Sequence, residues 1–291
     1  MSLFPLLPHA AAGHPVAFNQ QWPARICERL SADPQLAEVV PASRLEVRPT
    51  PEMVSSGIRE IDALTGGLPR GCLTEICGGA SSGRTSMLLA TLAAATQRQE
   101  ACALVDVSDA LDPASAASAG VQFERALWVR CGATQKTSPR RHRGTEKKFG
   151  REQKEKGASV EQALRVTDLL LQSGGFGLVI IDLGDVPIKI ARRIPLTSWF
   201  RFQRAVERTP TVLFVISQAP CTQSCAAVLL KVRASGKKLS ALSSQLSAKS
   251  PSHTQLLDGL HVEGELVRSR TQRKPPQSVT AAFATTATRT G

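Results

Sequence analysis

A nine-residue stretch rich in glycine and serine lies between two apolar runs and constrains the fold more than any other feature of the chain. Its residues are Gly78, Gly79, Ala80, Ser81, Ser82, Gly83, Arg84, Thr85 and Ser86. The run before it predicts a strand and the run after it predicts a helix. A glycine-rich turn from a strand into a helix is typical of a phosphate-binding loop, because its backbone N–H groups and the helix dipole attract an anion. The alternative is an ordinary Gly/Ser turn before a buried helix.

Arg84 stands where a phosphate-binding loop normally carries lysine. Arginine keeps the positive charge, but its planar guanidinium is bulkier and aims its N–H groups differently from a lysine ammonium. Thr85 is placed to offer its hydroxyl to a Mg²⁺ ion bound with the nucleotide. The loop therefore predicts weak or vestigial binding of ATP with Mg²⁺ and argues against efficient hydrolysis.

Apolar runs that favour strands alternate with helical patterns from residue 55 onward, which is typical of a parallel sheet covered by helices. Strands are expected at 72–77, 102–107, 126–131, 178–182, 211–217 and 226–232, and helices at 58–64, after the loop to 96, from Gly157 or Ser159 onward, and at 196–206. The expected fold is therefore α/β, with a mostly parallel central sheet flanked by helices. An alternating pattern around 260–267 adds a C-terminal β-hairpin with one exposed strand.

Composition divides the chain into segments. We expect a partly disordered N-terminal arm at 1–50, a core at 51–233 that contains a basic disordered insert at 134–157, a flexible linker at 234–252, the β-hairpin at 253–273 and a disordered tail at 274–291.

Asp182 ends the apolar run that begins at Leu178. A carboxylate at the C-terminal edge of a buried strand is the usual partner of a phosphate loop, where it holds Mg²⁺ through water. The alternative is a helix N-cap after the strand. The pattern of strand, helix and strand between the loop and this residue favours a shared site, so Thr85 and Asp182 are the candidate ligands of a nucleotide-bound Mg²⁺.

The net charge of +12 is concentrated in two segments. Residues 134–157 hold nine Lys or Arg and three Glu, and residues 231–274 hold nine Lys or Arg and three Asp or Glu, so each carries +6. Basic patches attract polyanions through counterion release, which makes nucleic acid the natural partner. The candidate DNA-binding residues are Arg140, Arg141, Arg143, Lys147, Lys148, Arg268, Arg270, Arg273 and Lys274. The alternative for the first segment is a solvated insert without a ligand.

The composition also bounds the compartment. Seven cysteines without regular spacing favour a reducing environment. The N-terminus lacks the basic start of a signal peptide, and no uncharged apolar run is long enough to span a bilayer, so no membrane is expected. Cytoplasmic localisation, in association with the nucleoid through DNA, is therefore the expectation.

From about residue 55 to 273 the chain resembles the RecA family of recombinase ATPases. Three stretches carry the resemblance: 56–58 with 66–71, the loop 78–86, and 105–113, which reads VDVSDALDP. The resemblance implies a RecA-like P-loop core, an ATP site at subunit borders and hence a homo-oligomer, and work in DNA repair. It also implies that Asp112 helps hold the adenine and that Gln218 senses the γ-phosphate.

Several departures from the family pattern concern the same implied site. Ser108 stands where the family places the glutamate that activates water, and a hydroxyl cannot act as that base at neutral pH. Ser115 stands where a tyrosine stacks on adenine. The DNA-binding loop that normally follows Gln218 is nearly deleted. Asp182 and Gln218 are the catalytic candidates if any ATPase activity remains, and a self-sufficient strand-exchange enzyme is disfavoured.

A RecA-like body with a degenerate ATP site is similar to the ImuA group of accessory proteins in damage-inducible translesion synthesis. Stretches such as 169–177 and 194–200 look like that group. The leading hypothesis is thus an accessory factor of the SOS response that works with a polymerase-like partner protein or with RecA. An active recombinase on single-stranded DNA and a nucleotide-independent scaffold are the alternatives.

Overall fold

Eight strands form one mixed sheet in the computed structural model, in the order β10-β9-β8-β3-β7-β6-β4-β5. The structure describes residues 50–131, 145–234, 259–270 and 280–286. The strands are β1 (Met53–Val54), β2 (Leu68–Pro69), β3 (Cys72–Cys77), β4 (Cys102–Asp106), β5 (Ala126–Arg130), β6 (Leu178–Asp182), β7 (Val212–Ser217), β8 (Val228–Ala234), β9 (Gly259–Ser269) and β10 (Thr280–Thr286). The helices are α2 (Arg59–Thr65), α3 (Arg84–Gln97), α4 (Pro113–Ser118), α5 (Thr145–Ser173), α6 (Ile188–Ala191) and α7 (Leu196–Val206), with short 3-10 turns η2 (Phe123–Arg125) and η3 (Gln223–Cys225).

The six strands from β8 to β5 are parallel, and β9 and β10 add an antiparallel pair at one end. In the centre, β3 lies between β7 and β8, where Thr74 pairs with Phe214 on one side and Val228 on the other. β1 and β2 form a separate two-stranded antiparallel sheet. The expected fold, a mostly parallel sheet flanked by helices with a C-terminal antiparallel strand pair, is confirmed.

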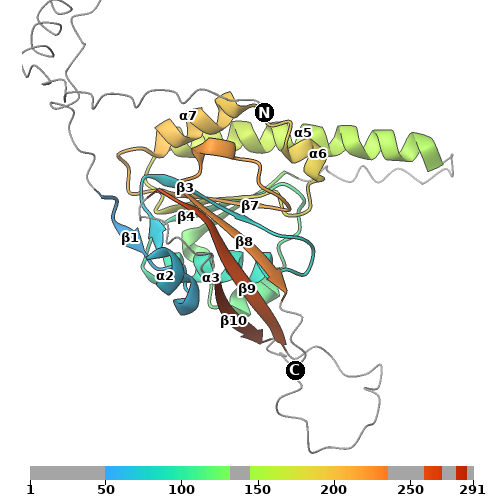
Figure 1. The fold of residues 1–291 in the computed structure, drawn as a ribbon. Helices are drawn as coiled ribbons and strands as arrows, with labels where there is room; N and C mark the ends of the chain where they lie inside the picture. Colours follow the sequence, from blue (N-terminus) through green and yellow to red (C-terminus); the bar gives the residue numbers. More distant parts are fainter. Residues whose placement is uncertain (1–49, 132–144, 235–258, 271–279, 287–291) are drawn as a thin grey trace, which may run out of the picture. The chain divides into compact units, whose positions relative to one another are not determined.

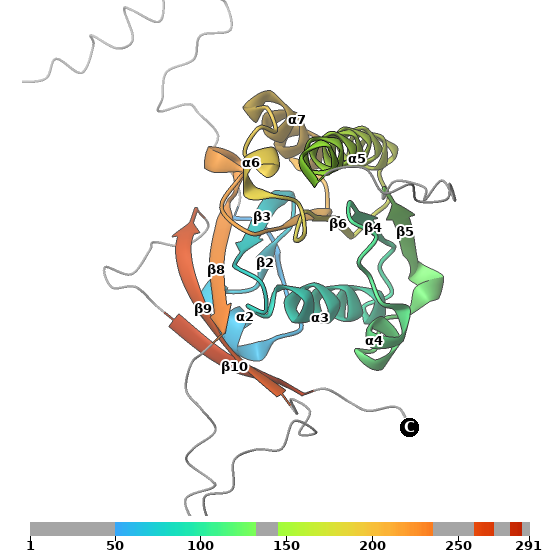
Figure 2. The ribbon, with the colours of Figure 1, turned by 90° about the vertical axis from the view of Figure 1, so that its right-hand side faces the viewer.

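Helices cover both faces of the sheet (Figures 1 and 2). α2, α3 and α4 lie on one face, and α5, α6 and α7 lie on the other. This two-sided cover explains why the central strands are almost continuous apolar runs rather than alternating ones. All six residues of β7, for example, are buried.

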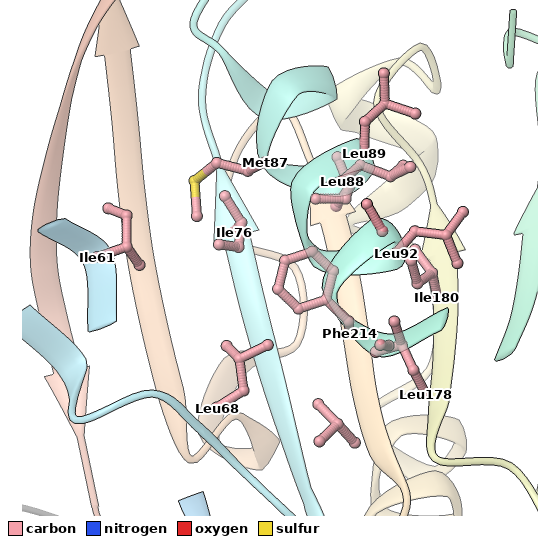
Figure 3. Packing of buried hydrophobic residues seen from close by; sticks show 14 of the residues in the cluster. Ile61, Leu68, Ile76, Met87, Leu88, Leu89, Leu92, Leu178, Ile180 and Phe214 are labelled. Carbon is pink, nitrogen blue, oxygen red and sulfur yellow. The ribbon is translucent and has the colours of Figure 1, made fainter. Parts of the chain in front are cut away.

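Each face has its own hydrophobic core. On the α3 side, Met87, Leu88 and Leu92 pack with Ile76 and Phe214 of the sheet (Figure 3). On the other side, Trp199 and Phe202 of α7 are fully buried and meet edge to face, with ring centroids 5.9 Å apart. The packing of α3 fixes the start of that helix, and hence the glycine-rich loop, at the C-terminal edge of β3.

Helix α5 begins earlier than the sequence indicates. It starts at Thr145, so residues 145–157 of the expected disordered insert are helical, and Gly157 lies inside the helix. The glycine is a poor guide here because it costs only about 1 kcal/mol in a helix interior, while the surrounding Glu, Lys and Gln residues favour helix. Figure 1 shows the first turns of α5 extending beyond the other helices of that face.

The C-terminal strands also differ from the expectation. β9 pairs with β8 on one side and with β10 on the other, and β10 lies within the stretch 274–291 that was expected to be a disordered tail. β9 is also not simply exposed, because Val262 and Leu266 on one of its faces are buried. Strand β10 is uncharged and pairs with β9 over seven residues. Its own sequence pattern is a weak strand signal, so the pairing with β9 determines that the segment is a strand. The expected N-terminal arm and linker lie outside the described residues.

Candidate phosphate-binding site

The glycine-rich loop joins β3 to α3 as expected. Gly83 is the N-cap of α3 with φ +88°, and no side chain caps the helix. The first N–H groups of a helix have no partner within it, so this helix start presents donors to an anion. Gly79, Ala80 and Ser81 are exposed, so the loop is open to solvent on that side.

Ser82 supports a ligand at this loop. The residue is only 4% exposed, and its Oγ has no hydrogen-bond partner among the described residues. Buried hydroxyls are normally paired, so an unpaired one inside a loop of this kind fits a missing acceptor. The residues present therefore fit a phosphate group, which would be held by the loop amides and the start of α3.

Two glycines of the loop are required by its surroundings. A Cβ on Gly78 would lie 2.4 Å from the carbonyl oxygen of Val232 in β8. A Cβ on Gly83 would lie 2.4 Å from Val262 in β9, and its positive φ disfavours other residues. The loop is thus packed closely against the C-terminal strands, a contact that the sequence did not indicate.

Arg84 is directed to a different partner from the one expected of a phosphate-loop lysine. Its Nη1 donates a hydrogen bond of 2.8 Å to the backbone oxygen of Gly184, in the segment after β6. The side chain is half-buried. The guanidinium therefore connects α3 to the segment after β6, and Thr85 beside it remains exposed.

Asp182 lies at the end of β6 beside the same segment. Its Oδ1 accepts a hydrogen bond of 2.7 Å from the Gly184 N–H. Burial raises the pKa of this carboxyl to about 6, although the Gly184 N–H opposes the shift, and the charge of Asp106 on the neighbouring strand raises it further. Asp182 and Asp106 are direct register partners in β6 and β4.

Gln218 reaches this segment from the end of β7. Its Nε2 donates to the backbone oxygen of Val186 at 3.2 Å. Residues 184–186 are thus held by three hydrogen bonds. Arg84 and Gln218 bind the backbone oxygens of Gly184 and Val186, and Asp182 binds the Gly184 N–H group. The structure brings together these three residues, which the sequence placed at one site, but it connects them through backbone rather than directly.

Asp112 acts as an N-cap in the structure. Its carboxylate accepts hydrogen bonds from the N–H groups of Ala114 and Ser115 and from the Ser115 hydroxyl at 2.5 Å. The Ser115 hydroxyl holds the pKa of this exposed carboxyl below its usual range. The two residues that the sequence related to adenine therefore bind each other at the start of α4.

Ser108 lies in a turn that Asp106 organises. The carboxylate of Asp106 is buried and accepts hydrogen bonds from the backbone N–H groups of Ser108, Ala110 and Leu111. It also accepts one from the indole N–H of Trp128 at 3.3 Å. With its oxygens so engaged, Asp106 is a structural group, and Ser108 brings no carboxylate to the site.

Glu75 is a buried carboxylate that sequence reasoning missed. It is fully buried in β3 and accepts from Ser217 Oγ at 3.0 Å, Cys221 N at 2.7 Å, Thr222 N at 3.2 Å and Thr222 Oγ1 at 2.5 Å. The available signal was a lone glutamate within the apolar run 72–77. It ties the strand that carries the phosphate loop to the crossover between β7 and β8.

That crossover is short, as expected. Residues 218–227 lead from β7 to β8 on the face of α7, and Cys221 and Cys225 belong to the hydrophobic core there. Two candidate DNA-binding residues brace it: Arg268 donates to the backbone oxygen of Gln223, and Arg270 donates to that of Ser224 at 2.5 Å.

The structure describes only two of the other candidate DNA-binding residues. Lys147 and Lys148 lie in the first turns of α5. Arg140, Arg141, Arg143, Arg273 and Lys274 lie outside the described residues.

Within the described part of the chain, no group of three or more His, Cys, Asp or Glu could hold a metal ion. Among the described helices, none has the length and apolar composition needed to cross a bilayer.

Comparison with known proteins agrees with this architecture. Residues 43–135 match the family model of the RecA N-terminal domain. These residues include β3, the phosphate loop, α3 and β4. The chain is therefore similar to the RecA N-terminal domain over this region.

Individual relatives show low identity to the chain. Protein RecA of Desulfotalea psychrophila is 28% identical over 182 residues, which cover 57% of this chain and 44% of that protein. Protein RecA of Rickettsia canadensis is 29% identical over 183 residues, covering 57% and 46%. The chain therefore spans less than half the length of each of these RecA proteins.

Proposed function

We propose that this RecA-like chain binds nucleotide phosphate at its glycine-rich loop without efficient hydrolysis and acts as a DNA-binding accessory factor. The hydrogen bond from Arg84 to Gly184 carries the first part of the proposal. It draws the loop's only cation toward the protein backbone, so a bound phosphate is held chiefly by backbone N–H groups. Ser108 supplies no general base, which removes a second requirement for hydrolysis.

ATP with Mg²⁺ is the proposed ligand. Thr85 is exposed at the start of α3, and Asp182 lies at the end of β6, so these are the residues that would hold the ion with the nucleotide. The raised pKa of Asp182 weakens it as a metal ligand in mildly acidic solution, because a protonated carboxyl no longer attracts a cation.

The proposed cellular role is damage response in the cytoplasm at the nucleoid, as a translesion-synthesis accessory factor of the ImuA type. Its partners would be DNA, particularly single strands, and a polymerase-like protein or RecA. The segment 134–157 with its charge of +6 and the short, braced crossover support DNA contact outside the crossover.

Calorimetric titration with ATP and Mg²⁺, combined with hydrolysis assays with and without single-stranded DNA, tests the proposal. We expect measurable binding and negligible hydrolysis. Robust DNA-stimulated hydrolysis that disappears in Asp182→Ala would instead identify an active ATPase. No binding heat at any ATP concentration would favour a nucleotide-independent scaffold.

A further inference from the structure

Among the residues that the structure describes, strand β10 forms one edge of the sheet and lacks the protection that edge strands usually have. Figure 2 shows it at the end of the sheet opposite to β5, and among the described residues no strand pairs with its outer side. Edge strands normally carry charges, proline or bulges that prevent pairing with another chain. The seven residues of β10, TAAFATT, include none of these charges or prolines, and their register with β9 is continuous.

The opposite edge is protected in the usual way. β5 carries the exposed Arg130, which forms an ion pair of 2.5 Å with Asp109. Charged groups of this kind disfavour the approach of a second strand. The contrast between the two edges marks β10 as the end of the sheet that is suited to strand addition.

The sequence of β10 is nearly palindromic about Phe283. Reading outward from this residue, Ala282 matches Ala284 and Thr280 matches Thr286, while only Ala281 and Thr285 differ. In an antiparallel pair of two identical strands centred on Phe283, each residue would therefore face one of the same or similar size. Two-fold symmetric interfaces require such self-complementarity.

The side chains of β10 suit close approach on both faces. Thr280, Ala282 and Ala284 are exposed and small on one face. Phe283 points to the other face, where it is buried in the core beside α2. A pair centred on Phe283 would place the two aromatic rings across from each other, an arrangement that stabilises antiparallel strands.

We propose that a second copy of this chain pairs with β10 through its own β10, in an antiparallel arrangement that joins the two sheets. The proposal is independent of nucleotide and DNA binding. Seven residues on each side make a small interface, so we expect a weak dimer with a Kd on the order of 10 µM.

Sedimentation analysis of the full chain tests this pairing. At about 100 µM, well above that Kd, the wild-type protein should sediment with the mass of a dimer. In the double variant Ala282→Asp, Ala284→Asp, carboxylates would face each other across the two-fold axis, and the protein should become a monomer. The same change at the exposed Ala117 and Ala119 near α4 is the matched control and should leave the dimer intact.

A charge-swap experiment separates pairing from damage to the fold. The variant Ala282→Lys, Ala284→Lys should also be a monomer alone but should form a heterodimer when mixed with the acidic variant. Unchanged thermal unfolding of both variants would show that the fold is intact. A monomeric wild-type protein, or a dimer that survives the acidic substitutions, would overturn the proposal.

Discussion

Arg84 donates a hydrogen bond of 2.8 Å from Nη1 to the backbone oxygen of Gly184, one hundred residues further along the chain. The cation of the phosphate loop is therefore a structural connection between α3 and the segment after β6. A Cβ on Gly184 would lie 3.4 Å from this Nη1 and 2.8 Å from Asp182 Oδ1, so the glycine makes room for both groups. The backbone N–H groups of the loop remain available to a phosphate, whereas the Arg84 guanidinium binds the protein backbone.

Replacing Arg84 by lysine should increase affinity for ATP with Mg²⁺. A lysine ammonium is compact and has no planar fork to hold the Gly184 oxygen, so more of its charge would reach the phosphates. We expect a gain of about tenfold in the association constant, measured by calorimetry, which corresponds to about 1.4 kcal/mol. Arg84→Gln removes the charge and is the control; equal affinities for the lysine and glutamine variants would contradict this explanation.

Asp182 should make the protein less stable as the pH rises. Its pKa is raised from 3.8 to about 6 in the folded state, so the folded protein binds the proton more tightly than the unfolded chain does. The contribution of this tighter proton binding to the stability of the fold is fully present below pH 4 and is lost as the pH rises through 6. At pH 7.5, Asp182→Asn should therefore increase the free energy of unfolding by about 1–3 kcal/mol. Urea unfolding at pH 4 and 7.5 measures the difference.

The matched control for Asp182 is Asp185, which is exposed in the same segment. Asp185→Asn should change stability by less than about 0.5 kcal/mol at both pH values. A benefit of Asp182→Asn that is the same at pH 4 and 7.5 would show that the carboxyl does not titrate in this range.

Gly83 and Gly79 should respond differently to alanine. Gly83 has φ +88° and no room for a Cβ beside Val262, so Gly83→Ala should destabilise the fold by about 2–4 kcal/mol. Gly79 has no atom within 4 Å of its Cβ position, so Gly79→Ala should leave stability nearly unchanged. Thermal unfolding of the two variants provides the comparison, and equal losses would contradict it.

The sequence predicted the local features of the site well. The apolar run that ends at Asp182 predicts strand β6, and the glycine-rich stretch predicts the turn into α3, because both depend on neighbouring residues. It could not predict that Arg84 binds Gly184 or that β10 completes the sheet. Such contacts join residues far apart in the chain, and the local pattern of one partner carries no information about the other.

Asp112 carries two signals in the sequence. The resemblance to the RecA family relates it to adenine, which stays a prediction, and in the structure its carboxylate caps α4 together with Ser115. An aspartate followed by proline at the first helical position is itself a strong capping signal. The local capping role of Asp112 is therefore readable from the sequence itself.

Glu75 should be essential for stability because of the hydrogen bonds that its buried carboxylate accepts. Glu75→Ala would leave the buried N–H groups of Cys221 and Thr222 without acceptors, at a cost of about 3–5 kcal/mol. Thr222→Val removes one hydroxyl donor and keeps the backbone donors, so it should cost only about 1–2 kcal/mol. Urea unfolding measures both; similar losses would mean that the backbone donors find other partners.

The salt dependence of DNA binding should identify the contribution of the first basic segment. Replacing Arg140, Arg141, Arg143, Lys147 and Lys148 by glutamine removes five charges from one stretch of sequence. Each lost phosphate contact should reduce the slope of log K against log salt by about 0.7 on single strands. If all five make contact, the slope falls by about 3.5, measured by fluorescence anisotropy between low and moderate salt.

Four arginines outside that segment offer a control for the measurement. They are exposed on or beside α6 and α7 and are not part of the proposed contact: Arg192, Arg193, Arg204 and Arg208. Neutralising these four should lower the affinity slightly through the net charge and change the slope less than the first set does. The comparison matters because a protein of net charge +12 attracts any polyanion over long range. Only a residue that contacts a phosphate releases a counterion, so only the removal of such a residue lowers the salt slope. Equal changes in slope for the two sets would assign residues 134–157 to solvated surface and place the DNA contact elsewhere.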